Sequence, residues 1–172
     1  GDGYQDNQRR NNDTGLVNQC WKDSWNSIVH PDGRLASEPR ATCELQGYVY
    51  DAWFRCARLA RTVWGDAELA DRLDQKAADL KERFNRDFWI EDLGYCAVAL
   101  DGEGKPADSI SSNPGHCLHL GILSREKARS VAERLQAPDM FSGWGIRTLS
   151  SLSPAYNPIG YHPGSVWQHD NA

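Results

Sequence analysis

The sequence lacks the features that mark membrane proteins and nucleic-acid-binding proteins. No apolar run approaches the roughly 20 residues of a transmembrane helix, and the chain begins with polar residues rather than a basic and apolar signal segment. Lysine and arginine together number 19 against 24 aspartates and glutamates, with both signs scattered along the chain. Neither nucleic acid nor a membrane is therefore an expected partner, and the chain is expected to be soluble and cytoplasmic.

Motifs for metals, nucleotides and disulfides are also missing. The five cysteines are odd in number and have no CxxC spacing, so they are expected to be reduced and mostly buried thiols. His116 and His119 lie three residues apart, but no HExxH pattern accompanies them, and no metal site is predicted. GxGxxG, P-loop and GxSxG patterns do not occur, which argues against nucleotide binding and serine hydrolysis. No cofactor is expected.

Two long amphipathic helices are predicted in the middle of the chain. From about Pro39, apolar residues recur at three- and four-residue steps until Gly65 ends the pattern. Asp66 is suited to cap a second helix, whose apolar stripe runs from Leu69 to Phe88. Because the connection has only about two residues, the helices must pack antiparallel as a helical hairpin.

Shorter elements are expected after this hairpin. Residues 94–100 have the composition of a strand that ends in a tight turn, which predicts a small β-hairpin. Ser112 and Ser124 each begin a further helix, the second closed by Pro138. The buried side of that last helix is expected to comprise Ala128, Val131, Ala132 and Leu135. The predicted fold class is all-α, with helical hairpins, a small β-hairpin and long loops.

Residues 15–28 have the composition of a ligand site rather than of a core. Trp21 and Trp25 offer flat faces to a ring-shaped ligand, and Asp23 between them is suited to move a proton. A carboxyl held against indoles loses solvation, which raises its pKa toward the range that a general acid needs. The alternative is a partly buried, tryptophan-rich loop whose aspartate caps a helix, and the residues of this stretch alone leave both interpretations open.

A second stretch of this kind begins at residue 139. Glycines and prolines bend the chain there, and Trp, Tyr, His, Asp and Asn side chains crowd the bends. Sugars offer apolar CH faces to indoles and hydroxyls to amides, imidazoles and carboxylates. A carbohydrate is therefore the ligand that best explains both stretches.

Five short blocks, spread over nearly the whole chain, carry a family resemblance. They are Asn18-Gln-Cys-Trp-Lys-Asp-Ser-Trp, Glu44-Leu-Gln-Gly-Tyr-Val-Tyr, Ser112-Asn-Pro-Gly-His, Met140-Phe-Ser-Gly-Trp-Gly-Ile-Arg-Thr-Leu and Tyr161-His-Pro-Gly-Ser-Val-Trp-Gln-His-Asp-Asn-Ala. In this order they resemble the bacterial amylo-alpha-1,6-glucosidase-like proteins, which are relatives of the glucosidase domain of glycogen debranching enzyme.

The resemblance implies part of an (alpha/alpha)6 toroid that hydrolyses alpha-glucosidic linkages, in glycogen-like or small alpha-glucosides, with inversion. Asp23 matches the general acid, and Glu44 matches a carboxylate that lines the pocket. The other candidates for substrate binding are Trp21, Lys22, Trp25, Gln46, Asn113, His116, Trp144, Tyr161, His162, Trp167, His169 and Asp170.

Departures from the family pattern affect the expected substrate more than the expected fold. Asn26 stands where many relatives carry an acidic residue. Gln168 and Cys20 stand where proline and glycine are usual, and His119 stands where tryptophan is common. The family's catalytic base is a glutamate in a later block that is not found before Ala172.

The chain is therefore expected to be an incomplete catalytic domain. Residues 1–36 would carry the acid, 37–137 the helical hairpins and 138–172 the pocket loops. Alone, it is expected to be inactive, and to self-associate if it is truncated. A non-catalytic carbohydrate-binding or scaffolding module remains the alternative.

Overall fold

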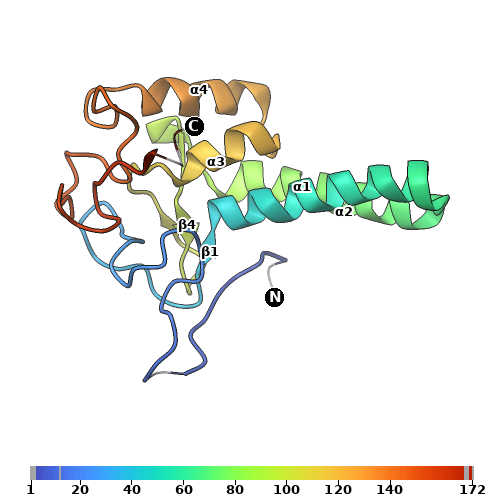
Figure 1. Ribbon diagram of the computed structural model, residues 1–172, viewed down its shortest axis with the longest axis horizontal. Helices are drawn as coiled ribbons and strands as arrows, with labels where there is room; N and C mark the ends of the chain where they lie inside the picture. Colours follow the sequence, from blue (N-terminus) through green and yellow to red (C-terminus); the bar gives the residue numbers. More distant parts are fainter. Residues whose placement is uncertain (1–2, 12, 169–170, 172) are drawn as a thin grey trace.

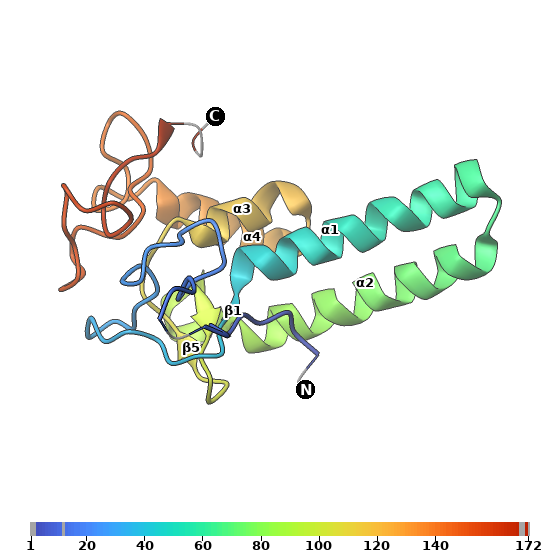
Figure 2. The same cartoon turned by 60° about the horizontal axis from the view of Figure 1, so that its bottom comes forward.

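The computed structural model describes residues 3–11, 13–168 and 171. A long helical arm projects from a body of shorter helices, two small sheets and extended loops (Figure 1). The helical segments are α1 (Cys43–Leu59), a π-helical turn (Ala60–Trp64), α2 (Ala67–Asp87), a 3₁₀ turn (Glu91–Leu93), α3 (Asn113–Leu120) and α4 (Arg125–Leu135). The N-terminal and C-terminal loops both lie on the body, away from the tip of the arm (Figure 2).

The arm is the predicted helical hairpin of α1 and α2. Gly65 adopts a left-handed conformation, with φ of 69°, and the Asp66 side chain accepts a hydrogen bond from the Leu69 amide at 2.9 Å. Both ends of the turn therefore lie where the sequence predicts them. The start of α1 was predicted too early, near Pro39, because Ala41–Thr42 forms strand β1 before the helix begins.

Removing the cap of α2 should lower stability without changing the fold. We expect Asp66→Ala to reduce the free energy of unfolding by about 1 kcal/mol, because the Leu69 amide loses its acceptor. Urea denaturation followed by circular dichroism measures this change. Asp66→Asn is the matched control, since asparagine caps helices about as well. Equal losses in both variants would show that the cap is not what stabilises this end of the helix.

The main core lies where the base of the arm meets α3, α4 and strand β3. Its largest fully buried members are Tyr95, Phe84, Phe88, Leu80, Ile122, Met140 and Val131. Leu135 of α4 is buried as predicted and Ala128 packs against the core, but Ala132 is exposed. The prediction for Ala132 is wrong because this position faces a cavity rather than the core.

The strands form two small antiparallel sheets. One has the order β1 (Ala41–Thr42), β4 (Ala99–Leu100) and β5 (Pro106–Ala107), and the other pairs β2 (Trp89–Ile90) with β3 (Tyr95–Cys96). The predicted β-hairpin exists as β4 and β5. The single strand predicted over residues 94–100 is instead divided between the sheets, since the Ala97 amide bonds to Phe88 and the Val98 amide to Ala107.

Buried polar groups hold the N-terminal loops on the body. The Asn7 and Arg40 backbones exchange two hydrogen bonds of 2.9 Å, and the Arg40 guanidinium donates to the carbonyl oxygens of Ala36 and Val17 and to Asn18 Oδ1. These loops are irregular in secondary structure, and buried hydrogen bonds connect them to the body.

All five cysteines are free thiols, and Cys43, Cys96 and Cys117 are buried.

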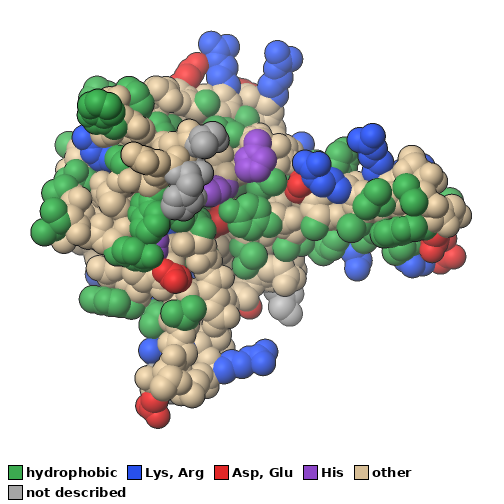
Figure 3. All heavy atoms as spheres, in the orientation of Figure 1, with side chains coloured by type: hydrophobic (Ala, Val, Ile, Leu, Met, Phe, Trp, Pro, Cys, Tyr) green, Lys and Arg blue, Asp and Glu red, His purple; other side chains and the backbone are tan. Residues whose placement is uncertain are grey.

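Hydrophobic side chains lie on the surface of the arm (Figure 3). The exposed ones on α1 and the π-helical turn are Tyr48, Phe54, Leu59, Val63 and Trp64. Self-association through such a surface stays a prediction. Within the described part of the chain, no helix is both long enough and apolar enough to span a membrane.

Candidate active site

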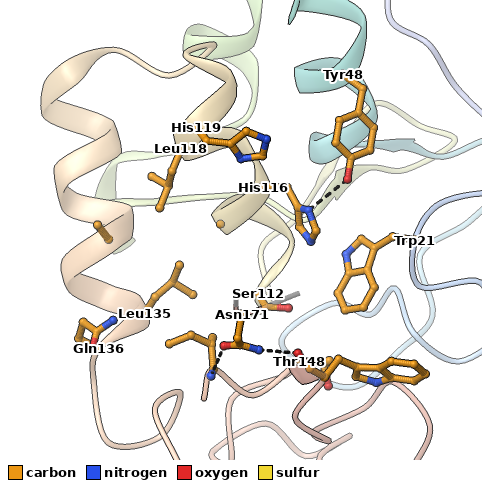
Figure 4. A pocket seen from close by; sticks show the side chains of 14 residues that line it. Trp21, Tyr48, Ser112, His116, Leu118, His119, Leu135, Gln136, Thr148 and Asn171 are labelled. Carbon is orange, nitrogen blue, oxygen red and sulfur yellow. Dashed lines mark hydrogen bonds between the residues drawn. The ribbon is translucent and has the colours of Figure 1, made fainter. Parts of the chain in front are cut away.

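A cavity of about 600 Å³ opens between α1, α3, α4 and the loops at both ends of the chain (Figure 4). Aromatic and imidazole rings that line it are Trp21, Tyr48, His116, His119 and Trp167. Neutral polar side chains that line it are Ser112, Gln136, Thr148 and Asn171. This volume falls in the usual range for sites that bind small molecules, and the lining combines flat rings with hydrogen-bonding groups.

Rings from three separate segments pack together at one side of this cavity. The Trp21 ring centre lies 5.3 Å from that of His116 and 5.5 Å from that of His162. His162 stacks on Trp167 at 5.3 Å, and Tyr161 packs edge-on against Trp167 at 4.9 Å. We call these five residues the aromatic cluster. Candidates from the first, third and last of the five sequence blocks therefore meet.

Asp23 lies beside the aromatic cluster, with Oδ1 4.0 Å from His162 Nδ1. Its side chain is 51% exposed, and Trp25 is also exposed. The expected shielding of Asp23 by two indoles is therefore wrong for this structure: Trp21 packs on the histidines, and Trp25 turns to the surface. The direct neighbour of Asp23, Ser24, is fixed by an Oγ–Nδ1 hydrogen bond of 2.9 Å to His162.

Side-chain hydrogen bonds hold the loop that carries Asp23. Asn18 Nδ2 donates to the carbonyl oxygen of Ser24 at 2.6 Å, and Ser27 Oγ donates to that of Lys22 at 2.6 Å. Such bonds from short polar side chains fix turns that have no regular secondary structure. The turn directs Lys22 inward and leaves Asp23 at the surface.

Lys22 and Gln46 are buried and do not line the cavity, so the predicted substrate contacts are wrong for both. Lys22 is fully buried, and its Nζ donates to the carbonyl oxygen of Thr148. Gln46 Nε2 donates to the carbonyl oxygens of Gln5 and Thr42, at 2.7 and 3.1 Å. Both side chains satisfy backbone groups between segments, which is the usual condition for burying a polar group.

Glu44 and Asn113 form a buried pair behind the cavity wall. Asn113 Nδ2 donates to Glu44 Oε1 at 3.1 Å, and both side chains are fully buried. Burial raises the pKa of Glu44 to about 8, and the Asn113 amide and the Lys22 ammonium oppose that rise. The predictions that Glu44 lines the pocket and that Asn113 contacts substrate are therefore wrong, because neither side chain is accessible from the cavity.

The remaining candidates lie at the edge of the site or outside it. Trp144 is 93% exposed at the tip of a turn closed by the hydrogen bond from the Ser142 amide to Gly145, and it does not line the cavity. Tyr161 is also exposed, and its carbonyl oxygen accepts from Trp167 Nε1 at 2.9 Å. His169 and Asp170 lie outside the described residues.

Tyr48 is a lining residue that the sequence reasoning missed. Its Oη lies 3.1 Å from His116 Nδ1, so it joins α1 to α3 at the cavity wall (Figure 4). Tyr48 follows Glu44 by four positions and shares its helix face, which is a signal that the sequence contained. Ser24 and Thr148 gave no such signal, since their partners are far away in sequence.

Across the described ranges, no group of three or more His, Cys, Asp or Glu side chains could hold a metal ion.

Comparison with known proteins identifies similar domains. Residues 6–172 match the family model of the mannosylglycerate hydrolase MGH1-like glycoside hydrolase domain, while no curated protein matches the chain. Among solved structures, a sialidase has a TM-score of 0.73 at 17% identity, over 92% of this chain and 15% of its own.

Two further structures carry names of glycoside hydrolases. The GH63 mannosylglycerate hydrolase from Thermus thermophilus, in complex with glucose, has a TM-score of 0.66 at 16% identity, over 76% of this chain and 32% of its own. Neutral trehalase Nth1 from Saccharomyces cerevisiae has a TM-score of 0.63 at 16% identity, over 85% and 27%. At these identities the likeness concerns the fold, and the chain spans at most about a third of each of the three structures.

Proposed function

Because the chain belongs to the mannosylglycerate hydrolase MGH1-like glycoside hydrolase family, we propose that it is part of a glycosidase that hydrolyses small alpha-glucosides with inversion. The observation that carries this proposal is the cavity, in which Trp21, His116 and Trp167 offer ring faces to a sugar while Asp23 lies beside the same cluster. The helical arm and α3–α4 would then be part of an (alpha/alpha)6 toroid.

Asp23 is the proposed general acid. In an inverting glycosidase one carboxylic acid protonates the leaving oxygen, and a second carboxylate about 6.5–9.5 Å away activates water on the opposite face of the sugar. Asp23 stands at the surface beside the rings, where a bound sugar would cover it. Glu44 is not suited to activate this water, since its side chain is fully buried. The proposal places the base in a part of the enzyme outside residues 1–172, because the chain spans at most about a third of the similar structures.

The linkage is a finer part of the proposal. The five sequence blocks favour an alpha-1,6-glucosidic bond, as in the branch points of glycogen. The names of two similar structures contain mannosylglycerate hydrolase and trehalase, which indicate small glycosides. We therefore propose isomaltose-type glucosides as the first substrates to examine, with trehalose and mannosylglycerate as competitors.

An assay of the enzyme that carries this chain tests the proposal. The enzyme is incubated with isomaltose, maltose, trehalose and mannosylglycerate, and the anomer of the first product is followed by proton NMR. We expect beta-glucose from an alpha-glucoside. Alpha-glucose as the first product would contradict inversion, and mannose release alone would contradict the glucoside specificity. Sugar binding without turnover of any substrate would support the carbohydrate-binding module instead.

A further inference from the structure

Among the contacts that join α1 to α3, one polar pair is buried and another lies at the cavity wall. The buried one is the 3.1 Å hydrogen bond from Asn113 Nδ2 to Glu44 Oε1. Tyr48 follows Glu44 by four positions and His116 follows Asn113 by three, and the Tyr48 Oη and His116 Nδ1 atoms lie 3.1 Å apart. Since residues three or four positions apart share a helix face, the buried pair lies about one turn behind the pair that the cavity exposes.

The loop that carries Asp23 reaches the same buried region through Lys22. The Lys22 ammonium donates to the carbonyl oxygen of Thr148 and lies 5.3 Å from the centre of the Trp21 ring. It also favours the charged form of Glu44, which places the two groups within electrostatic reach. A buried ammonium depends on the dipoles and charges around it, so a change at Glu44 acts on Lys22 and on its two neighbours in sequence.

We propose that Glu44 is a positioning residue, which holds the α1–α3 wall and the Asp23 loop in the arrangement that receives the sugar. The side chain does not touch substrate, because it is fully buried. Two of its properties matter: the acceptor oxygen that Asn113 needs, and the neutral state of the carboxyl within electrostatic reach of Lys22. The effect on turnover rests on the proposed glycosidase function, whereas the structural effect does not.

The surroundings of Glu44 favour its neutral form. Burial is the largest cause of its raised pKa of about 8, and the adjacent Cys43 adds to the rise. Asn113 and Lys22 act in the opposite direction. Among the described residues, further titratable groups that interact with it are Cys20 of the Asp23 loop, Cys96 of strand β3 and Cys117 of helix α3.

Ionisation of Glu44 should therefore disturb Lys22 as the pH rises through about 8. Below this pH the carboxyl is neutral, and the Lys22 ammonium keeps its hydrogen bond to the carbonyl oxygen of Thr148. Above it, the buried carboxylate attracts the ammonium, and opposite charges interact more strongly inside a protein than in water. We expect the Lys22 backbone to report this change.

A titration of selectively ¹⁵N-lysine-labelled protein measures it without any need for turnover. The Lys22 amide resonance, assigned with Lys22→Arg, should shift with a midpoint near pH 8 in the wild type and lose this transition in Glu44→Gln. Asp51→Asn is the matched control, because Asp51 lies on the same helix and pairs with Arg55, and it should keep the transition. A transition that persists in Glu44→Gln would overturn the proposal.

Turnover supplies the second measurement. We expect Glu44→Ala to lower kcat about 10- to 100-fold with KM changed less than about threefold, since misplacing a reacting group by 1 Å can cost 10²-fold. Glu44→Gln keeps the acceptor for Asn113 and should restore most of this loss at pH 6. A folded Glu44→Ala with wild-type kcat would overturn the proposal, and if it does not fold, the Gln variant and the titration decide. If the titration behaves as expected but no glycoside is hydrolysed, the positioning role stands and the proposed function fails.

Discussion

Asp23→Asn should lower kcat by about 10²- to 10⁴-fold on alpha-glucosides with poor leaving groups, the range that general acid catalysis usually supplies. Asparagine has nearly the same shape and cannot donate the proton, so the change removes one chemical step and leaves the loop intact. Steady-state kinetics of the enzyme that carries this chain would measure it. An aryl glucoside with a good leaving group should lose much less, because its departure needs little protonation.

Asp32→Asn is the matched control for this experiment. Asp32 lies nine positions further along the chain, and its side chain is 54% exposed, compared with 51% for Asp23. Its carboxylate accepts hydrogen bonds from the Arg34 amide and guanidinium within a turn. The kcat of the Asp32→Asn variant should therefore stay at the wild-type level. Wild-type turnover of Asp23→Asn on poor leaving groups would refute the assignment of Asp23.

The exposure of Asp23 changes how it would act as an acid. One of the two interpretations of this stretch is that Trp21 and Trp25 shield the carboxyl from water, yet only Trp21 joins the aromatic cluster. In the proposed function, a sugar seated on the cluster supplies the shielding that Trp25 does not. Closing a site over reacting groups removes water in this way.

Local signals explain why the helical part could be predicted from the sequence. The turn of the arm depends on Gly65, which adopts its left-handed backbone without steric cost, and on Asp66, which caps the next helix within three residues. The split of residues 94–100 between two sheets could not be predicted in this way. It depends on which distant segments pair with β3 and β4.

The sequence indicates which segments carry candidate site residues, but it does not indicate how their side chains are arranged in space. Trp21, His116, His162 and Trp167 come together in the aromatic cluster. The predicted substrate contacts include Lys22, Gln46 and Asn113, which are buried, because residue type does not show which way a side chain points. In the loop that carries Asp23 the direction reverses between Lys22 and Asp23, and only the contacts with Thr148 and His162 reveal it.

Phe84→Ala should destabilise the fold far more than loss of the α2 cap in Asp66→Ala. Phe84 is fully buried on α2 and stacks on Phe88 with ring centres 4.6 Å apart. Truncating such a residue removes its burial and leaves a cavity, at a cost of about 3–5 kcal/mol. Domains of this size are stable by only about 5–15 kcal/mol, so a large share of the total would be lost.

Phe54→Ala is the matched control, and urea denaturation of both variants shows whether the loss of stability comes from removing a buried side chain or from removing any phenylalanine. Phe54 lies on α1 and is 53% exposed, and most exposed substitutions change stability by less than about 0.5 kcal/mol. Because α2 packs against α1, which carries Glu44 and Tyr48, unfolding of the arm should also release the cavity wall. The indole N–H resonances of Trp21 and Trp167, followed by NMR, should then lose their folded-state positions at the same urea concentration as the helical signal. Separate transitions would show that the wall is stable without the arm.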